Sequence, residues 1–143
     1  MLPNFLKPYQ INNSNLIRIG PKRDGGYVID NRIIKKTHNL ITFGLNDDWE
    51  FEKEFLKKNT NCNLHAYDHT INNRFWIKRF KKDIIHLLLF KKLRWWKILD
   101  IFKYINYLNF FRKNKIHLQK KIVSKKKKKN QITISKIFNK LKN

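Results

Sequence analysis

Short apolar runs and a stretch with helical spacing follow one another in the first half of the chain. Residues 39–44 form an apolar, β-branched run that ends at a glycine, as a buried parallel strand does. Residues 64–68 form a second run, and residues 49–58 between the two place several apolar side chains on one helical face. This order of strand, helix and strand predicts a βαβ unit over residues 37–70, and therefore a parallel sheet.

The preceding segment, residues 1–36, is predicted to be a loop followed by two short strands. The strand candidates are residues 16–19 and residues 27–29. The glycine pair of Asp24-Gly25-Gly26 predicts a plain hairpin turn between them, and a ligand-binding loop is the alternative.

The second half is predicted to add helices first and then one more strand. Residues 71–112 read as two consecutive helices rich in Lys, Phe and Trp. Residues 116–123 alternate apolar and polar side chains, and Ser135 can cap a last helix, so residues 115–142 supply a third strand and a helix. We therefore predict a single α/β domain over residues 1–143, a Rossmann-like parallel sheet of about three core strands with a helical, basic insertion.

The ends of the first two predicted sheet strands carry residues that suit a nucleoside-containing cofactor. Ligands of open α/β sheets bind outside the carboxyl ends of the strands. Gly44 would let the backbone approach a ligand closely, and Asp68 could accept two hydrogen bonds from a ribose diol. The alternative interpretation is an ordinary turn and a helix cap.

The acids of the first turn discriminate between cofactors. Asp47 and Asp48, which we also expect to cap the following helix, would repel a pyrophosphate, and the sequence holds no G-x-G-x-x-G fingerprint. S-adenosylmethionine has no phosphate and carries a sulfonium and an ammonium group, so acids near this turn favour it electrostatically.

Three segments of this region are similar to a known family. Residues 41–52 (ITFGLNDDWEFE) and residues 65–70 (HAYDHT) resemble the strand ends of FkbM-like S-adenosylmethionine-dependent methyltransferases. Residues 18–28 (RIGPKRDGGYV) resemble the segment that precedes them in the same class. The resemblance covers residues 16–70, weakens through residues 71–112 and returns faintly after them.

The resemblance implies a cofactor site and a reaction. It implies that Gly44 lies against S-adenosylmethionine, that Asp68 binds the ribose hydroxyls and that the Asn46-Asp47 turn lies near the methionine end. It implies methyl transfer to a hydroxyl of a sugar or secondary metabolite, so the partner would be a small-molecule or glycan acceptor. Thr42 departs from the pattern, because many methyltransferases carry an acid there. No catalytic base for the acceptor can be named.

The length of the chain also departs from the family pattern. The family continues into a fourth strand with an acid-rich D-x-E-G signature, and this sequence reaches Asn143 where that strand would begin. We therefore expect a truncated fold in which the first sheet strand has an unpaired edge. An inactive methyltransferase relic is one alternative function.

The charge distribution supports a second class of function. The formal net charge is +23, and residues 1–68 hold ten Lys and Arg against eight Asp and Glu. Residues 69–143 hold twenty-three Lys and Arg against two acids. Such a basic half is typical of proteins that meet polyanions. The alternative is thus a small basic binding protein for RNA or anionic membrane, with Trp95 and Trp96 in the contact surface.

The remaining composition excludes several other classes. A lone cysteine, Cys62, rules out an internal disulfide, and the five histidines lack metal-ligand spacing, so we expect no metal site. We see no secretory signal and no apolar run of about 20 residues, so we expect a cytoplasmic protein without a transmembrane segment. The sequence does not fix the oligomeric state.

Overall fold

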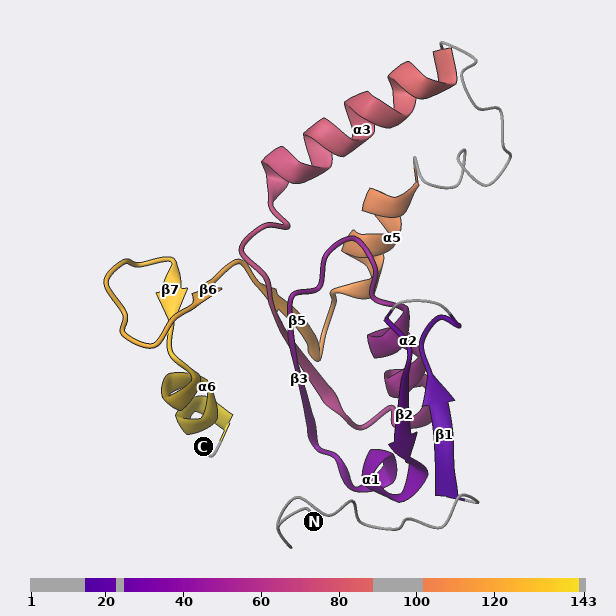
Figure 1. Cartoon of the computed structure of the whole chain (residues 1–143), viewed down its shortest axis with the longest axis vertical. Helices are drawn as coiled ribbons and strands as arrows, with labels where there is room; N and C mark the ends of the chain where they lie inside the picture. Colours follow the sequence, from indigo (N-terminus) through magenta and orange to yellow (C-terminus); the bar gives the residue numbers. More distant parts are fainter. Residues whose placement is uncertain (1–14, 23–24, 89–101, 142–143) are drawn as a thin grey trace, which may run out of the picture. The chain divides into compact units, whose positions relative to one another are not determined.

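The computed structural model describes residues 15–22, 25–88 and 102–141. The chain divides into two compact units whose segments alternate along the sequence. The first unit comprises Met1–His38 and Trp49–Asn61, and the second comprises Asn39–Asp48 and Cys62–Asn143. The predicted α/β class is confirmed at the level of a small parallel sheet accompanied by several helices (Figure 1).

The first unit contains an antiparallel pair of strands, β1 (Leu16–Ile19) and β2 (Tyr27–Asp30). Both strands were predicted, and their pairing confirms the hairpin, although Asp24 of its turn lies outside the described residues. Gly20 leaves β1 with a φ of 86°, and a Cβ at this position would lie 2.7 Å from the carbonyl oxygen of Gly25. The turn therefore requires a glycine at residue 20.

Two helices complete the first unit, α1 (Asn31–Lys36) and α2 (Glu50–Lys58). The side-chain amide of Asn59, at the end of α2, donates hydrogen bonds to the carbonyl oxygens of Ile34 at 2.6 Å and Thr37 at 2.8 Å. These carbonyls belong to the last turn and C-cap of α1, so Asn59 joins the two helix ends. The most buried apolar side chains of this unit are Ile19, Ile34, Trp49, Phe55 and Leu56.

The second unit contains the parallel sheet, in the order β3 (Asn39–Phe43), β4 (Asn63–Tyr67) and β5 (Lys115–Leu118). Both pairs of neighbouring strands are parallel, as predicted. β4 is central, and its Leu64 and Ala66 side chains are fully buried. In the described part of the chain, β3 is an edge strand of this sheet.

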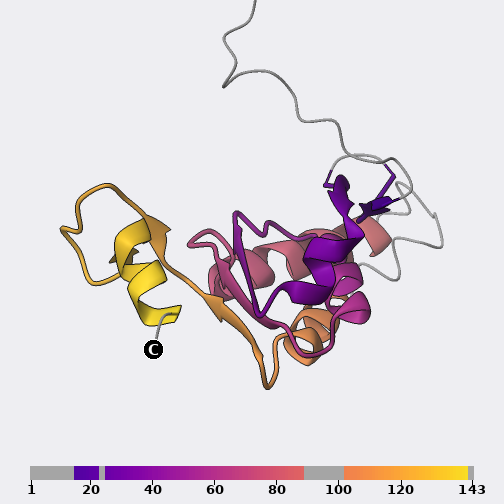
Figure 2. The ribbon, with the colours of Figure 1, turned by 90° about the horizontal axis from the view of Figure 1, so that it is seen from below.

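Helices cover both faces of this sheet. Ile41, Tyr67 and Leu118, one from each strand, pack with Ile137 of α6 (Ile134–Leu141). His117, the neighbour of Leu118, points to the opposite face because side chains alternate along a strand, and there it contacts α5 (Lys103–Phe110). Figure 2 shows α6 on one side of the strands and α5 on the other.

The basic helical segment is confirmed where it is described. α3 (Asn73–Leu88) and α5 are joined by aromatic contacts, with the ring centroid of Trp76 lying 5.3 Å from Tyr104 and 4.9 Å from Tyr107. Such ring pairs add to the stability gained by burial alone. Residues 89–101, which include Trp95 and Trp96, lie outside the described residues.

Three local predictions were wrong. The strand expected over residues 116–123 is divided into β5 and a short β6 (Lys121–Ile122), which pairs in parallel with β7 (Gln131–Ile132). α2 begins after Trp49, and Asp47 does not cap it because its carboxylate is held by cations elsewhere. Thr133, not Ser135, caps α6, since its Oγ1 accepts from the Lys136 N–H at 3.3 Å.

None of the described helices has the length and apolar content that crossing a membrane requires.

Candidate functional site

The carboxyl ends of the three sheet strands are held in line by backbone hydrogen bonds. The N–H of Gly44 donates to the carbonyl of Tyr67 at 3.1 Å, and the N–H of Asp68 donates to the carbonyl of Leu118 at 3.1 Å. Gly44 and Asp68 therefore leave adjacent strands at the same level. This is the edge of a parallel sheet at which ligands bind.

The turn after β3 is formed by two residues in the left-handed region. Gly44 has a φ of 78° and Asn46 a φ of 51°. A Cβ placed on Gly44 would meet no atom within 4 Å, so its glycine is required by backbone conformation and not by crowding. Asparagine is one of the few other residues that tolerate this conformation. The turn thereby directs the Asn46 N–H toward Asp68.

Asp68 is the polar centre of the strand ends. Its Oδ1 accepts from the N–H of Thr70 at 2.7 Å and from the Thr70 hydroxyl at 2.6 Å. Its Oδ2 accepts from the N–H of Asn46 at 3.0 Å. A carboxylate offers about four acceptor positions, so these three bonds leave about one for a ligand. The predicted contact with both ribose hydroxyls stays a prediction, and this geometry favours a single hydroxyl.

The charge of Asp68 is maintained although the residue is only 6% exposed. Burial raises the pKa of this carboxyl, but the hydrogen bonds from Thr70 and Asn46 lower it further, so the pKa lies below its ordinary value. Asp68 is therefore an ionised acceptor at neutral pH.

A pocket of about 400 Å³ opens at these strand ends. Its wall is formed by Gly44, Tyr67, Asp68, His69, Thr70, Lys120, Lys121 and Ile122. This volume is in the range of small-molecule sites. Of the four predicted cofactor residues, Gly44 and Asp68 line the pocket, and Asn46 is joined to it through its bond to Asp68.

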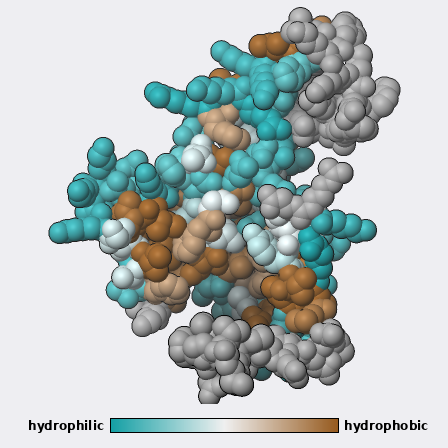
Figure 3. Space-filling view, viewed as in Figure 1, coloured by the Kyte–Doolittle hydropathy of each residue, from teal (hydrophilic) through white to brown (hydrophobic). Residues whose placement is uncertain are grey.

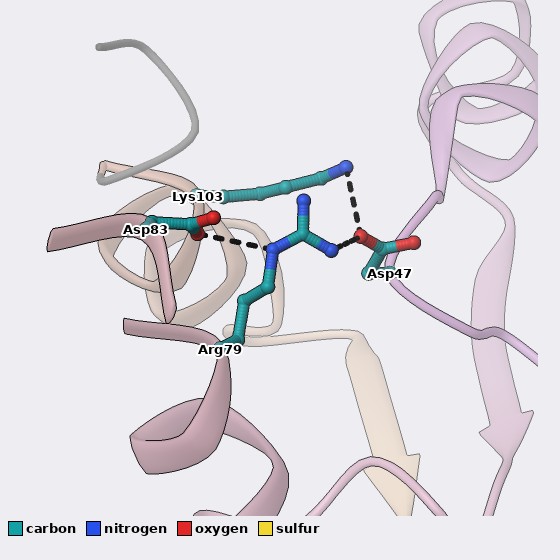
Figure 4. A network of polar contacts seen from close by, with 4 residues as sticks. All are labelled: Asp47, Arg79, Asp83 and Lys103. Carbon is teal, nitrogen blue, oxygen red and sulfur yellow. Dashed lines mark hydrogen bonds and ion pairs between the residues drawn. The ribbon is translucent and has the colours of Figure 1, made fainter. Parts of the chain in front are cut away.

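The fourth predicted residue, Asp47, belongs to a separate network (Figure 4). Its Oδ2 forms ion pairs with Arg79 of α3 and, at 3.4 Å, with Lys103 of α5, while Nε of Arg79 also bonds Asp83 at 3.0 Å. Burial raises the pKa of Asp47, but the charges of Lys103 and Arg79 outweigh it and the pKa lies below its ordinary value. The contact of Asp47 with the cations of a cofactor stays a prediction, and these ion pairs disfavour it because they already balance its charge.

A second polar chain reaches the strand ends from α5. The Nε2–H of His117 donates to the backbone carbonyl of Asp68 at 3.0 Å, since a carbonyl can only accept. Nδ1 then accepts from the Tyr107 hydroxyl, at 2.5 Å. Burial lowers the pKa of His117. Burial also raises the pKa of Tyr107, and together with the nearby Tyr104 and Asp68 it brings that pKa to about 12.

A larger hollow, of about 480 Å³, lies against Trp76, Phe80 and Tyr104 of α3 and α5. Its described lining contains no acid and no strand end. In the described part of the chain, no three His, Cys, Asp or Glu side chains are grouped as metal ligands. We therefore place the candidate site at the strand ends.

Sequence reasoning missed Lys120, Lys121 and His117 as neighbours of this site. Both lysines were included in the predicted third strand, and only its division after Leu118 brings them to the pocket. His117 is a polar residue of an alternating pattern, next to the apolar Leu118. Its place on a strand that neighbours β4, and therefore Asp68, was the signal that could have identified it. The partner of its ring, Tyr107, could not be inferred from spacing.

In comparisons with protein-family models, with curated proteins and with solved structures, nothing matches the chain.

Proposed function

We propose that this chain forms the cofactor-binding part of an S-adenosylmethionine-dependent methyltransferase of the FkbM-like class. The observation that carries the proposal is that Gly44 and Asp68, the two strand-end residues singled out in the sequence, line one pocket. They lie on adjacent parallel strands, where a nucleoside cofactor of an α/β sheet binds. The acceptor would be a hydroxyl of a sugar or a secondary metabolite.

The chain's own residues would act by binding and orientation. The ionised carboxylate of Asp68 would accept one ribose hydroxyl through the free position on Oδ2, while Asn46 and Thr70 hold its orientation. The open space beside Gly44 would admit the cofactor against the backbone. S-adenosylmethionine supplies a methyl group already activated by the sulfonium, so positioning of the two reactants accounts for much of the catalysis.

Isothermal titration with S-adenosylmethionine and S-adenosylhomocysteine tests the proposal. We expect Asp68→Asn to weaken binding by roughly tenfold or more, since a hydrogen bond to a charged acceptor is lost. Gly44→Ala should also weaken it, because an L-residue is strained at this φ and its Cβ would enter the pocket. Asp83→Asn is the matched control, as it removes an acid of the same unit that does not line the pocket.

Circular dichroism of each variant separates loss of the site from loss of the fold. The proposal is contradicted if the folded native chain binds neither compound. It is also contradicted if Asp68→Asn and Asp83→Asn have the same affinity for both.

A second candidate function, RNA binding, is favoured by the loop between β6 and β7. This loop carries five consecutive exposed lysines, Lys125 to Lys129, and Figure 3 shows hydrophilic side chains gathered over this region. The run contains no apolar residue that could insert into a lipid surface, so it would bind phosphates by charge alone. If this binding is only the diffuse attraction of a polycation, it should fall steeply with salt and change little when Trp95 and Trp96 are replaced by Ala. A large, salt-resistant loss from the Trp variant would instead make a dedicated binding protein the leading function.

A further inference from the structure

Two basic residues line the pocket together with Asp68. Lys120 and Lys121 lie two and three residues after the end of β5 at Leu118, the strand next to β4, which Asp68 follows. Lys120 is half-buried and Lys121 exposed. In the part of the chain that the structure describes, neither lysine forms an ion pair. Two ammonium groups thus border a pocket of ligand size without a direct ion-pair partner.

Asp68 is the acid that lines the same pocket, and it is ionised. It forms no ion pair with either lysine among the described residues, so two ammonium groups stand against a single carboxylate whose hydrogen bonds go to Asn46 and Thr70. Asp47, the next nearest acid along the strand-end turn, is paired with Arg79 and Lys103. From residue 101 to residue 143 the sequence contains fourteen Lys and Arg and neither Asp nor Glu. The field at this side of the pocket is therefore positive.

The backbone fixes the position of the two lysines. The N–H of Lys120 donates to the carbonyl of Leu118 at 2.7 Å, and the N–H of Lys121 donates to the carbonyl of Asn130 at 2.9 Å. Lys121 is also paired with Gln131 in the β6–β7 ladder. A cation held next to a pocket by backbone bonds on both sides loses less conformational freedom on binding than one on an unsupported loop.

We infer that Lys120 and Lys121 bind an anionic group, a carboxylate or a phosphate, of the ligand that occupies this pocket. The inference takes the identity of the ligand from the proposed function. It adds that this ligand carries a negative charge where it meets the two lysines. Two sources share this chemistry. One is the carboxylate of the cofactor's methionine part, and the other is an anionic group on a sugar acceptor.

The β6–β7 loop offers a matched control. Lys125→Gln with Lys126→Gln removes the same two charges from the same unit as Lys120→Gln with Lys121→Gln, but outside the pocket wall. A diffuse field predicts equal effects of the two double variants, whereas a defined site predicts a larger effect of the pocket variant. Lys120 is half-buried and the other three replaced lysines are exposed, so circular dichroism is used to verify that both variants remain folded.

The experiment is isothermal titration of the full chain with two matched pairs of probes. S-adenosylhomocysteine is compared with its decarboxylated analogue, which keeps the ammonium and lacks only the carboxylate, and glucose 6-phosphate is compared with glucose. We expect the member that carries the anionic group to bind more tightly in at least one pair. We expect the pocket variant to reduce that affinity roughly tenfold and the loop variant to reduce it less than about twofold.

The pair that responds identifies the source of the anion. Loss for S-adenosylhomocysteine alone assigns the lysines to the cofactor carboxylate, and loss for glucose 6-phosphate alone assigns them to the acceptor. Equal losses from the pocket and loop variants overturn the inference, as does equal binding of the two members within both pairs of probes. Binding of glucose 6-phosphate through the two lysines, without binding of either adenosyl compound, would instead refute the proposed function and leave the anion site standing.

Discussion

The backbone N–H of Asn46 donates a hydrogen bond to Oδ2 of Asp68 over 3.0 Å, although 22 residues separate them in the sequence. The bond joins the turn after β3 to the first residue after β4. It requires the left-handed φ of 51° at Asn46, which would be strained in most other residues. The shape of the pocket entrance therefore depends on the charge of Asp68 as well as on the sheet.

We predict that Asp68→Asn lowers the free energy of unfolding by about 2 kcal/mol, since three donors then face a neutral amide. The pKa of Asp68 is lowered in the folded protein, so its contribution is complete above its ordinary pKa of 3.8 and is lost as the pH falls through the folded value. Urea unfolding at neutral pH and near pH 3 measures both effects. If the native protein and the Asp68→Asn variant lost the same free energy of unfolding between these two pH values, the role given to the Asp68 carboxylate would be contradicted.

The ion pair between Asp47 and Arg79 should stabilise the attachment of α3 to the turn after β3. Both side chains are partly buried, with 19% and 29% exposure. A double-mutant cycle of Asp47→Asn and Arg79→Gln should give a coupling of about 1–2 kcal/mol. The control is a second cycle, of Asp47→Asn with Lys103→Gln. Its coupling energy should be smaller, because the contact between Lys103 and Asp47 is longer, at 3.4 Å. Equal couplings in the two cycles would disagree with the geometry.

The strand ends could be predicted from the sequence because the signals are local. An apolar run ending at Gly44 and another ending at Asp68 define both the strands and their carboxyl ends. The division of the third strand could not be predicted, since Lys120 and Lys121 continue an alternating pattern that does not mark where β5 ends. Helix α1 also escaped prediction, because a helix of six residues carries too little periodicity.

The chemistry of the site was less predictable than its place. The sequence placed both Asp47 and Asp68 at the ligand, the first near its methionine end and the second on its ribose hydroxyls. Their roles differ because Arg79 and Lys103, 32 and 56 residues further along the chain, neutralise only the first. Which acid gains a cation depends on how α3 and α5 return to the sheet, and this long-range packing leaves no short-range signal.

Thr42 provides a test of the sheet interior. Its Oγ1 is buried and has no hydrogen-bond partner among the described residues. Thr42→Val keeps the shape and removes the unsatisfied hydroxyl, so we predict an increase in the free energy of unfolding of about 1 kcal/mol. The same replacement at Thr70 removes a 2.6 Å bond to Asp68 and should decrease it by about 1–2 kcal/mol. Urea unfolding of both variants measures the two changes in the free energy of unfolding. A decrease for Thr42→Val would contradict the prediction, because it would show that the Thr42 hydroxyl has a hydrogen-bond partner.

The link from Tyr107 through His117 to the Asp68 carbonyl should make stability depend on pH in the weakly acidic range. Burial lowers the pKa of His117 below its ordinary value of 6.5, so the unfolded chain binds the proton more readily than the folded protein. Stability is therefore highest above about pH 6.5 and decreases as the pH falls from there toward the folded pKa. His117→Gln should reduce the change of the urea-unfolding midpoint between about pH 7.5 and about pH 5, and His65, whose pKa burial also lowers, accounts for part of what remains. Tyr107→Phe is the control, because it removes a hydrogen bond worth about 1 kcal/mol but leaves the imidazole to titrate. Titration of the His117 ring by NMR at or above its ordinary pKa would contradict the prediction, because a buried neutral imidazole that donates to Asp68 and accepts from Tyr107 must resist protonation.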